Sequence, residues 1–374
     1  MIFWASVGLL VYTQFGYPLV LLALARLTPK PAPSARRGGE PKVSLIVAAH
    51  NEQSVIAAKV ANALALDWPR ERLELIICAD GCSDATVARA REAGADQVLD
   101  LERCGKIPAL DAGVAVSVGE LLVFSDSNVS LERDAIARLA DAFADPSVGY
   151  ACGQVVFVQA GAGPDADNQE GLYWRYEMAV RTLESRVRSV TAGNGGIQGA
   201  RRDAYVVIDP RMDHDIFLPF HMVKHGLRAV YVPQARGVEK MVPSIEGEFA
   251  RKRRFMVHVW VTVLRGGMLS PRGYGLRYSL MIASHRVLRY SSWALHIIAL
   301  VTNAVLLGQG TVYIVCFALQ LSLLGAAILA GAVRLRPLLV SRYYVAMNAA
   351  IALGLWDYLR RETPTWWEAP EGTR

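Results

Sequence analysis

The chain contains long stretches without charge at both ends and a charge-rich region between them. No charged side chain occurs in residues 1–25, and basic residues begin at Arg26. An apolar run of about 20 residues crosses a hydrocarbon core of about 30 Å as a helix. We therefore predict an N-terminal transmembrane helix over residues 1–26. Because the basic residues follow this run, an uncleaved anchor is favoured over a cleaved signal peptide, with the rest of the chain starting in the cytosol.

The C-terminal third has a similar apolar character. Residues 291–333 are free of charge, and a break at 308–310 (Gly-Gln-Gly) divides them into two segments. Basic residues stand on both sides, so we predict a transmembrane hairpin over 290–333 whose ends lie in the cytosol. The apolar segment within 338–358 is marginal in length and has basic flanks at both ends. A third transmembrane segment and a re-entrant segment both remain open for it, followed by a tail at 359–374.

The central region alternates short β-prone runs with stretches of helical spacing. The predicted strands are 43–49, 73–79, 97–99 and 120–125, and the predicted helices are 52–66, 84–93, 107–118 and 131–143. Such alternation is typical of the α/β class, with a mostly parallel sheet and helices on both faces.

Three further segments complete the predicted organisation. Residues 27–41 carry Pro, Gly and Arg without apolar periodicity and read as a linker. Residues 42–255 form one cytosolic domain of ordinary size. Residues 256–289 mix aromatic, apolar and basic side chains, which favours amphipathic helices at the membrane interface. Ordinary surface helices of the soluble domain are the alternative for this last segment.

Composition narrows the range of partners. The net charge of +6 is concentrated near the predicted membrane ends and at residues 251–254. Anionic membrane lipids or a diphosphate explain this placement better than nucleic acid, so we expect no nucleic-acid partner. The five cysteines form no CxxC pair, which argues against structural disulfides and a zinc site.

Polar and acidic side chains follow three of the predicted strands. They are His50, Asn51 and Glu52 after the first, Asp80 and Asp84 after the second, and Ser125, Asp126 and Asn128 after the fourth. Ligands of open parallel sheets bind at the carboxyl ends of the strands, so this edge could hold a nucleoside and a divalent metal. Asn51 and Asp84 are also suited to capping the helices that follow them.

These motifs carry a family resemblance. VSLIVAAHNE (43–52), DGCSD (80–84), Gly105 with Lys106, and SDSN (125–128) together resemble the nucleotide-binding half of family 2 glycosyltransferases with the GT-A fold. The flanking membrane segments resemble the members that synthesise polysaccharides or glycolipids.

The resemblance implies a role for each matched residue. The nucleotide would be contacted by His50, Glu52, Asp80, Lys106 and Asp126. Mg²⁺ or Mn²⁺ would be bound by Asp126 and Asn128. The family motif has a second aspartate where this chain has Asn128, so the metal would depend more on Asp126 and on the donor diphosphate.

The acceptor half resembles the family less closely. By resemblance, Asp215 matches the catalytic base of inverting members, with Asp213 as a rival and helix capping as the alternative for Asp215. The glycine-rich loop before it allows close approach of a substrate, so Asn194, Gly195 and His214 are predicted to bind the acceptor, although a plain turn also explains the glycines.

A basic run lies where processive relatives carry QxxRW. Arg251 and Arg254 are predicted to bind the diphosphate, while Arg251 and Phe255 replace the glutamine and tryptophan of that motif. The departure favours transfer of one or few sugars over polymer synthesis. A basic stripe touching lipid is the alternative.

Together these features predict an inverting glycosyltransferase that moves a sugar from a nucleotide diphosphate sugar, UDP by preference, to a lipid-linked or saccharide acceptor. It would be a multi-pass protein of the inner or plasma membrane, with its catalytic domain on the cytosolic face. Exopolysaccharide or cell-envelope glycan synthesis is the predicted setting, with other membrane glycan-assembly proteins as partners. The alternatives are a catalytically weak or inactive scaffold subunit and a nucleotidyltransferase on the same sheet.

Overall fold

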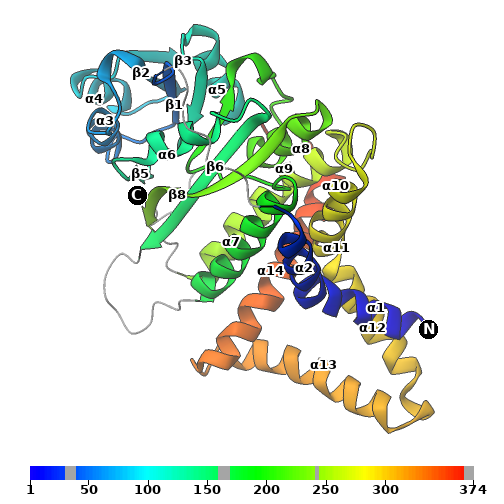
Figure 1. The fold of residues 1–374 in the computed structure, drawn as a ribbon. Coiled ribbons are helices and arrows are strands. Elements are labelled where there is room, and N and C mark those ends of the chain that lie inside the picture. The colour runs from blue at the N-terminus through cyan, green and yellow to red at the C-terminus, as the bar shows by residue number, and fades with distance from the viewer. Residues whose placement is uncertain (30–38, 159–168, 241–243, 366–374) are drawn as a thin grey trace.

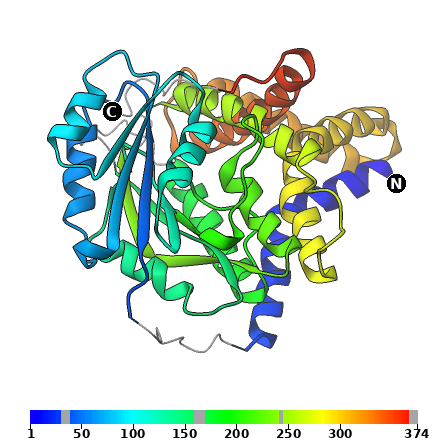
Figure 2. The same cartoon turned by 90° about the horizontal axis from the view of Figure 1, so that it is seen from above.

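The computed structural model describes the chain except for residues 30–38, 159–168, 241–243 and 366–374. A soluble domain built on one sheet lies above a set of long helices that includes both α1 and α13 (Figure 1). Figure 2 shows the first strands side by side, with helices on both sides of them.

The sheet has eight strands in the order β3-β2-β1-β4-β7-β6-β8-β5. Their bounds are β1 Val43–Ala49, β2 Leu73–Asp80, β3 Gln97–Leu101, β4 Leu121–Phe124, β5 Ser130–Leu131, β6 Val148–Val158, β7 Gln198–Arg201 and β8 Arg228–Lys240. The first four pair in parallel, as the alternating pattern predicted. β7 is antiparallel to β4 and β6, β5 is antiparallel to β8, and β6 and β8 are parallel. The second half of the sheet is therefore mixed.

Alternate residues of the central strands face two separate layers of helices. Leu45 and Leu75 pack with α3 (Ile56–Leu64), α4 (Thr86–Glu92) and α6 (Ala135–Ala142) on one face. Ile46 and Ile76 pack with α5 (Lys106–Val116) on the other. Because both faces of a parallel sheet are covered, its strands are continuously apolar, which is why the sequence identified them.

Helix α3 begins at Ile56, four residues later than the predicted helix. Asn51 takes a left-handed backbone conformation with φ of 52°, and its side-chain oxygen accepts a hydrogen bond from the Ser83 amide. The prediction that Asn51 caps the next helix is therefore wrong, because the Asn51 side chain joins the turn after β1 to the turn after β2. Asp84 Oδ1 accepts a hydrogen bond from the Thr86 amide at 3.0 Å, although the N-cap position of α4 itself is Ala85.

The second half of the chain adds four helical elements to the domain. They are α7 Gln169–Val187, α8 His214–Lys224, α9 Ile245–Arg265, and a run of α10 Leu276–Met281, the π-helical turn Ile282–Val287 and α11 Leu288–Tyr290. Short 3₁₀ turns occur at Arg70–Arg72, Arg202–Ala204 and Leu307–Gln309. The predicted boundary at residue 255 falls inside α9, because one amphipathic helix carries buried residues on both sides of that point.

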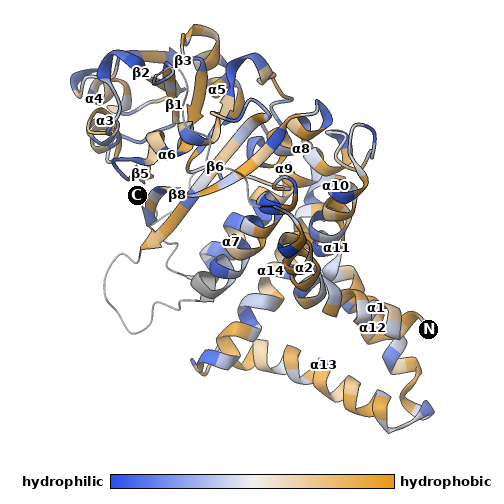
Figure 3. Cartoon of the chain, viewed as in Figure 1, coloured by the Kyte–Doolittle hydropathy of each residue, from blue (hydrophilic) through white to orange (hydrophobic). Residues whose placement is uncertain are grey.

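The remaining helices are apolar. The N-terminal helix consists of α1 Ile2–Val11, a π-helical turn Tyr12–Gly16 and α2 Tyr17–Leu27, and the C-terminal set is α12 Ser292–Val305, α13 Thr311–Leu329 and α14 Arg336–Arg360. In the described part of the chain, Ile2–Leu27, α13 and α14 are long and apolar enough to cross a membrane, while α12 is shorter. The ribbon of α13 is coloured mostly apolar in Figure 3, and exposed apolar side chains occur on α1, α12 and α13, among them Leu9, Val301 and Leu319. An exposed apolar surface of this kind marks a membrane or protein contact.

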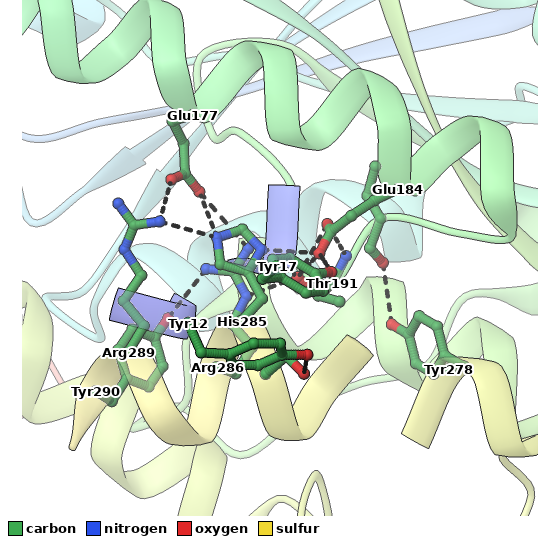
Figure 4. Close-up of polar contacts among 12 residues, drawn as sticks. Tyr12, Tyr17, Glu177, Glu184, Thr191, Tyr278, His285, Arg286, Arg289 and Tyr290 are labelled. Atoms are coloured by element: carbon green, nitrogen blue, oxygen red, sulfur yellow. Dashed lines mark hydrogen bonds and ion pairs between the residues drawn. The ribbon is translucent and has the colours of Figure 1, made fainter. Parts of the chain in front are cut away.

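A buried network of polar and charged side chains joins the N-terminal helix to the soluble domain (Figure 4). Its principal members are Tyr17, Glu177, Glu184, His285, Arg286 and Arg289. Glu184 accepts a hydrogen bond from the Tyr17 hydroxyl at 2.6 Å and contacts His285 Nδ1 at 2.7 Å. Glu177 pairs with Arg289 at 3.2 Å and with His285 at 3.3 Å. α2, α7 and the α10–α11 run are thus held together by paired charges.

Candidate active site

The turn after β2 is organised around the Asp80 carboxylate. Asp80 is 3% exposed, accepts hydrogen bonds from the backbone amides of Cys104 and Gly105, and pairs with Arg103 at 2.7 Å. Gly81 has φ of 59°, and a Cβ there would lie 2.8 Å from Arg103 Cα. Only glycine therefore fits the turn. Asp80 fixes the loop that leads into Lys106.

His50 and Glu52 lie beside this turn. His50 Nδ1 is 2.6 Å from the Asp80 carbonyl oxygen, so the imidazole joins the ends of β1 and β2. The backbone amide of Glu52 donates a hydrogen bond to Thr86 Oγ1 at 2.8 Å, and the Glu52 side chain is buried. The residues predicted for the nucleoside are thus gathered at one edge of the sheet.

Lys106 begins α5 and reaches the turn after β4. Its Nζ lies 2.5 Å from Asp126 Oδ1. The same turn is supported from beneath by Lys59 of α3, which is 3% exposed and donates to Ser125 Oγ at 2.7 Å and to the Val129 carbonyl at 2.6 Å. Burial lowers the pKa of Lys59 to about 7. Sequence reasoning missed Lys59, because a lone lysine in a helical segment carries no signal.

The turn also meets the end of β8. Asn128 Nδ2 donates to Glu239 Oε1 at 3.1 Å. Burial and the charge of Asp126 raise the pKa of Glu239 to about 7. Glu239 was not predicted, since it lies 111 residues from Asn128 in the sequence.

Asp126, Asn128 and Glu239 form a corner, called the candidate metal corner below, whose side-chain oxygens suit a hard divalent cation. In the described part of the chain no group of three or more His, Cys, Asp or Glu side chains gathers as a metal site. Asp126, Glu239 and Asn128 carry side-chain oxygens of the type that Mg²⁺ and Mn²⁺ take as ligands. The two carboxylates repel one another in the metal-free protein, and a cation would relieve that repulsion.

Asp215, in the first turn of α8, is held by a glutamine from β7. Gln198 Nε2 donates to Asp215 Oδ1 at 2.7 Å, and Gln198 Oε1 accepts from the Tyr150 hydroxyl at 2.7 Å. The tyrosine therefore sets the orientation of the amide. Burial raises the pKa of Asp215, although Lys106 and Gln198 act in the opposite direction. The result is a carboxylate with a fixed orientation and enhanced basicity.

Asp213 occupies a different position. Its Oδ1 accepts from the Ile216 amide at 2.9 Å, so Asp213 is the N-cap of α8. Helix capping was the alternative considered for Asp215, and the structure gives that contact to Asp213 instead. Burial and the nearby Asp215 raise the pKa of Asp213.

His214 is buried, and the acceptor contact predicted for it stays a prediction. The side chain is 3% exposed and packs edge-on against Phe124 with ring centres 4.7 Å apart. Its two ring nitrogens lie 3.2 Å from Gln198 Nε2 and 3.2 Å from the Tyr205 hydroxyl. Burial lowers the pKa of His214 to about 3, which keeps the imidazole neutral.

The glycine-rich loop before β7 packs directly on Asp215. A Cβ at Gly195 would lie 2.7 Å from Asp215 Oδ2, and one at Gly193 would lie 1.7 Å from the Tyr150 hydroxyl. Larger residues would displace both groups, so the loop is more than a plain turn. Asn194 stands between these glycines, and its buried Nδ2 has no hydrogen-bond partner in the described structure.

The two arginines predicted to bind a diphosphate face different surroundings. Arg251 pairs with Glu248 at 2.8 Å and lies 6.0 Å from the ring centre of Phe157. Its charge acts on Glu239, which places it near the candidate metal corner. Arg254 is exposed.

The separate turns converge electrostatically. Lys106 feels the charges of Asp126, Asp215 and Asp213, and Asp215 in turn feels Asp126. Asp80 is connected to this group of charges because its carboxylate accepts a hydrogen bond from the amide of Gly105, the residue before Lys106. A cation-lined acidic edge at the ends of β1, β2, β4 and β7 is the arrangement that binds a nucleotide diphosphate and a metal.

Comparison with known proteins agrees with this arrangement. A family model described as Glycosyl transferase family 2 matches residues 44–209. The structure resembles that of a mannosyltransferase from Pyrobaculum calidifontis in complex with GDP-Man and Mn²⁺, with a TM-score of 0.73, 20% identity, and coverage of 97% of this chain and 100% of the other.

Two curated relatives share part of the sequence. A beta-monoglucosyldiacylglycerol synthase of Synechocystis is 28% identical over 221 residues, which are 53% of this chain and 43% of the relative. An N-acetylglucosaminyltransferase of Rhizobium leguminosarum is 25% identical over 246 residues, 60% of this chain and 56% of the relative. The chain thus spans about half the length of the curated relatives it matches.

The mixed sheet and the likeness to the mannosyltransferase structure define a GT-A fold. Residues 44–209 carry the match to glycosyl transferase family 2.

Proposed function

We propose that the chain catalyses inverting transfer of a sugar from a nucleotide diphosphate sugar to an acceptor hydroxyl at a membrane surface. The observation that carries the proposal is the ion pair of Lys106 with Asp126 at 2.5 Å, because the charge of Asp215 acts on the same ammonium group. This places a candidate diphosphate-binding cation next to a candidate base.

In this mechanism Asp215 takes the proton of the acceptor hydroxyl. The acceptor oxygen forms a bond to the anomeric carbon while the bond from that carbon to the β-phosphate oxygen breaks, and the electron pair leaves with the nucleotide diphosphate. A positioned general base contributes about 10²- to 10⁴-fold in rate. Gln198 orients Asp215 for the proton transfer.

Charge on the leaving diphosphate is stabilised by cations of this chain. Lys106 is the nearest, and Arg251 and Arg254 of α9 are further candidates. When Mg²⁺ or Mn²⁺ is bound, held by Asp126, Asn128 and Glu239, it adds positive charge at the same oxygens.

The donor is proposed to be a UDP-sugar, with its nucleoside near His50, Glu52 and Asp80. This preference rests on the family resemblance of these turns. The Pyrobaculum calidifontis structure was solved with GDP-Man, so GDP-mannose belongs in any donor screen.

The acceptor is proposed to be lipid-linked or a saccharide, bound near Asn194 and Gly195. One curated relative is named for a glucosyldiacylglycerol product and another for N-acetylglucosamine transfer, which supports both classes. The setting is exopolysaccharide or cell-envelope glycan synthesis, with other membrane glycan-assembly proteins as partners.

The membrane arrangement is also a proposal. The N-terminal helix (1–26), the hairpin (290–333) and the segment 338–358 would place a multi-pass protein in the inner or plasma membrane. Three helices of sufficient length and apolarity support it. The basic residues at their ends favour a cytosolic catalytic domain.

The test is nucleotide release by the purified full chain in detergent. A panel of UDP-sugars and GDP-mannose is incubated with Mg²⁺ or Mn²⁺, and the released nucleotide and the product are identified by mass spectrometry. We expect turnover of one donor, inversion at the anomeric carbon, and loss of turnover in Asp215→Asn. Asp203→Asn, an exposed acid on the same domain, is the matched control and keeps full activity.

Full activity in Asp215→Asn would remove Asp215 from the mechanism. Donor binding without turnover, or turnover that requires a second membrane protein, would favour the scaffold alternative. Release of pyrophosphate in place of a nucleoside diphosphate would indicate a nucleotidyltransferase.

A further inference from the structure

Arg181 of α7 differs from the other buried charges of the molecule. Glu177 and Glu184, one helical turn to either side of it, are paired within the network of Figure 4. Among the described residues no ion pair joins Arg181 to an acid, and its Nε and Nη1 have no hydrogen-bond partner. The side chain is 5% exposed. Each charged member of the network has an oppositely charged partner within 4 Å, whereas Arg181 has none among the described residues.

The guanidinium is held between two aromatic rings. Its carbon lies 6.0 Å from the ring centre of Trp174 and 5.9 Å from that of Tyr231. Trp174 is itself fixed by a hydrogen bond to the Val155 carbonyl at 2.9 Å. Cation–π contacts contribute to holding the charge, but a buried cation with open N–H groups still carries a large desolvation cost. An anion reaching these N–H groups would offset it.

The position of Arg181 relative to Asp215 follows from the sheet register. Tyr231, Cys152 and Gln198 lie opposite one another on β8, β6 and β7, so their side chains share one face. The charge of Arg181 acts on the Cys152 thiol and on Asp215, and Gln198 holds Asp215. Neighbouring strands are about 5 Å apart, which puts Arg181 within one or two strand spacings of the proposed base.

The same register separates Arg181 from the donor diphosphate. Glu239, at the candidate metal corner, pairs with Phe157 on β6. The Trp174 ring lies 6.0 Å from the guanidinium carbon and 5.1 Å from the ring centre of Phe157, so Arg181 is one ring removed from Phe157, whereas its charge acts directly on Asp215. An anion at Arg181 would therefore belong to the acceptor.

We propose that Arg181 binds a phosphate of the acceptor, and that the acceptor carries this phosphate within a few bonds of the hydroxyl that is glycosylated. The inference rests on the proposed function, because it takes Asp215 as the base. A planar guanidinium with two open N–H groups matches phosphate oxygens in a bidentate arrangement, which lysine does not reproduce. Two acceptor types share this chemistry: a phospholipid with a hydroxyl in its headgroup, and a saccharide on a polyprenyl diphosphate.

The experiment compares three acceptors with the donor identified in the screen. They are diacylglycerol, which is neutral, phosphatidylglycerol, and a monosaccharide linked to polyprenyl diphosphate. We expect one of the two phosphate-bearing acceptors to be used at least tenfold better than diacylglycerol, measured as kcat/KM. The better of the two identifies the source of the phosphate.

The variant series then tests the residue. Arg181→Gln should raise the KM for that acceptor at least tenfold and leave the KM for the donor unchanged. Arg181→Lys should raise it less, because the charge remains and the bidentate geometry is lost. Arg175→Gln, an exposed arginine on the same helix, is the control and should change neither value.

Preference for diacylglycerol, or an unchanged acceptor KM in Arg181→Gln, would overturn the proposal. If Arg181→Gln does not fold, Arg181→Lys decides alone, and an unchanged acceptor KM in that variant overturns the proposal. Hydrolysis of the donor without acceptor separates the two levels. If the protein hydrolyses a donor but prefers the neutral acceptor, only the role of Arg181 is refuted. If it neither hydrolyses any donor nor transfers a sugar, the result counts against the proposed function.

Discussion

Gln198 Nε2 donates a hydrogen bond to Asp215 Oδ1 at 2.7 Å, and the Tyr150 hydroxyl fixes the other end of the amide. A hydrogen bond to a charged group contributes about 1.5–3 kcal/mol. The glutamine thus favours the ionised form of a carboxyl that burial otherwise pushes toward protonation.

Gln198→Ala should lower kcat by about tenfold or more, in proportion to the hydrogen bond lost. It should also move the acid limb of the kcat–pH profile to higher pH, because the pKa of Asp215, already raised by burial, rises further without its donor. A base is active only when deprotonated, so activity falls as pH decreases through that pKa. Tyr150→Phe, which keeps the amide, should shift the limb less. An unchanged limb in Gln198→Ala would contradict the positioning role.

Asp213 and Asp215 should respond differently to substitution. Asp213→Asn keeps an N-cap of similar quality and should retain both activity and stability, while Asp213→Ala should lower stability by about 1 kcal/mol. Thermal unfolding in detergent and nucleotide release measure the two effects. Loss of turnover in Asp213→Asn would restore Asp213 as the base.

The metal corner predicts opposite effects for two neighbouring substitutions. Glu239→Gln removes a charged oxygen ligand and should weaken Mn²⁺ activation by tenfold or more. Asn128→Asp adds a carboxylate and should strengthen it, while it destabilises the metal-free protein through repulsion with Glu239 and Asp126. Activity titrated with Mn²⁺ measures the first effect, and thermal unfolding with chelator measures the second. Equal Mn²⁺ dependence in Glu239→Gln and the native chain would exclude Glu239 as a ligand.

Lys59 should make stability depend on pH. Its pKa is about 7 in the folded chain against an ordinary value of 10.5, so between these values the unfolded state binds more protons. Stability from this group therefore rises as pH increases from about 7 to 10.5. Lys59→Met should lose that rise, measured as the difference in thermal midpoint between pH 7 and pH 9.5. The same slope in both proteins would show that Lys59 titrates normally.

The buried network should tolerate substitution poorly. Burial raises the pKa of Glu177, but Arg289 and His285 outweigh it and hold the pKa well below its usual range. Removing one member of a buried pair costs about 3–5 kcal/mol, so Glu177→Gln should lower the thermal midpoint strongly. Glu246→Gln breaks the pair that Arg342 forms with a 67% exposed acid. It should change the free energy of unfolding by less than about 1 kcal/mol and so leave the thermal midpoint nearly unchanged. Similar midpoints for both variants would refute the anchoring role.

The sequence by itself determined the parts that depend on local pattern. Continuous apolar runs located β1 and β2, because strands buried on both faces leave no polar positions. Charge-free stretches located the apolar helices, and acidic turns at strand ends located Asp80 and Asp126. Each of these signals lies within a few consecutive residues.

Only the tertiary structure decided which distant side chains meet. Asn128 contacts Glu239 across 111 residues, and Lys59 reaches Val129 across 70. Gln198 gains its place beside Asp215 from the pairing of β7 with β4 and β6, which periodicity does not specify. His214, predicted to bind the acceptor, is buried and packs against Phe124. A side chain's role in this protein depends on partners that the chain brings together only when it folds.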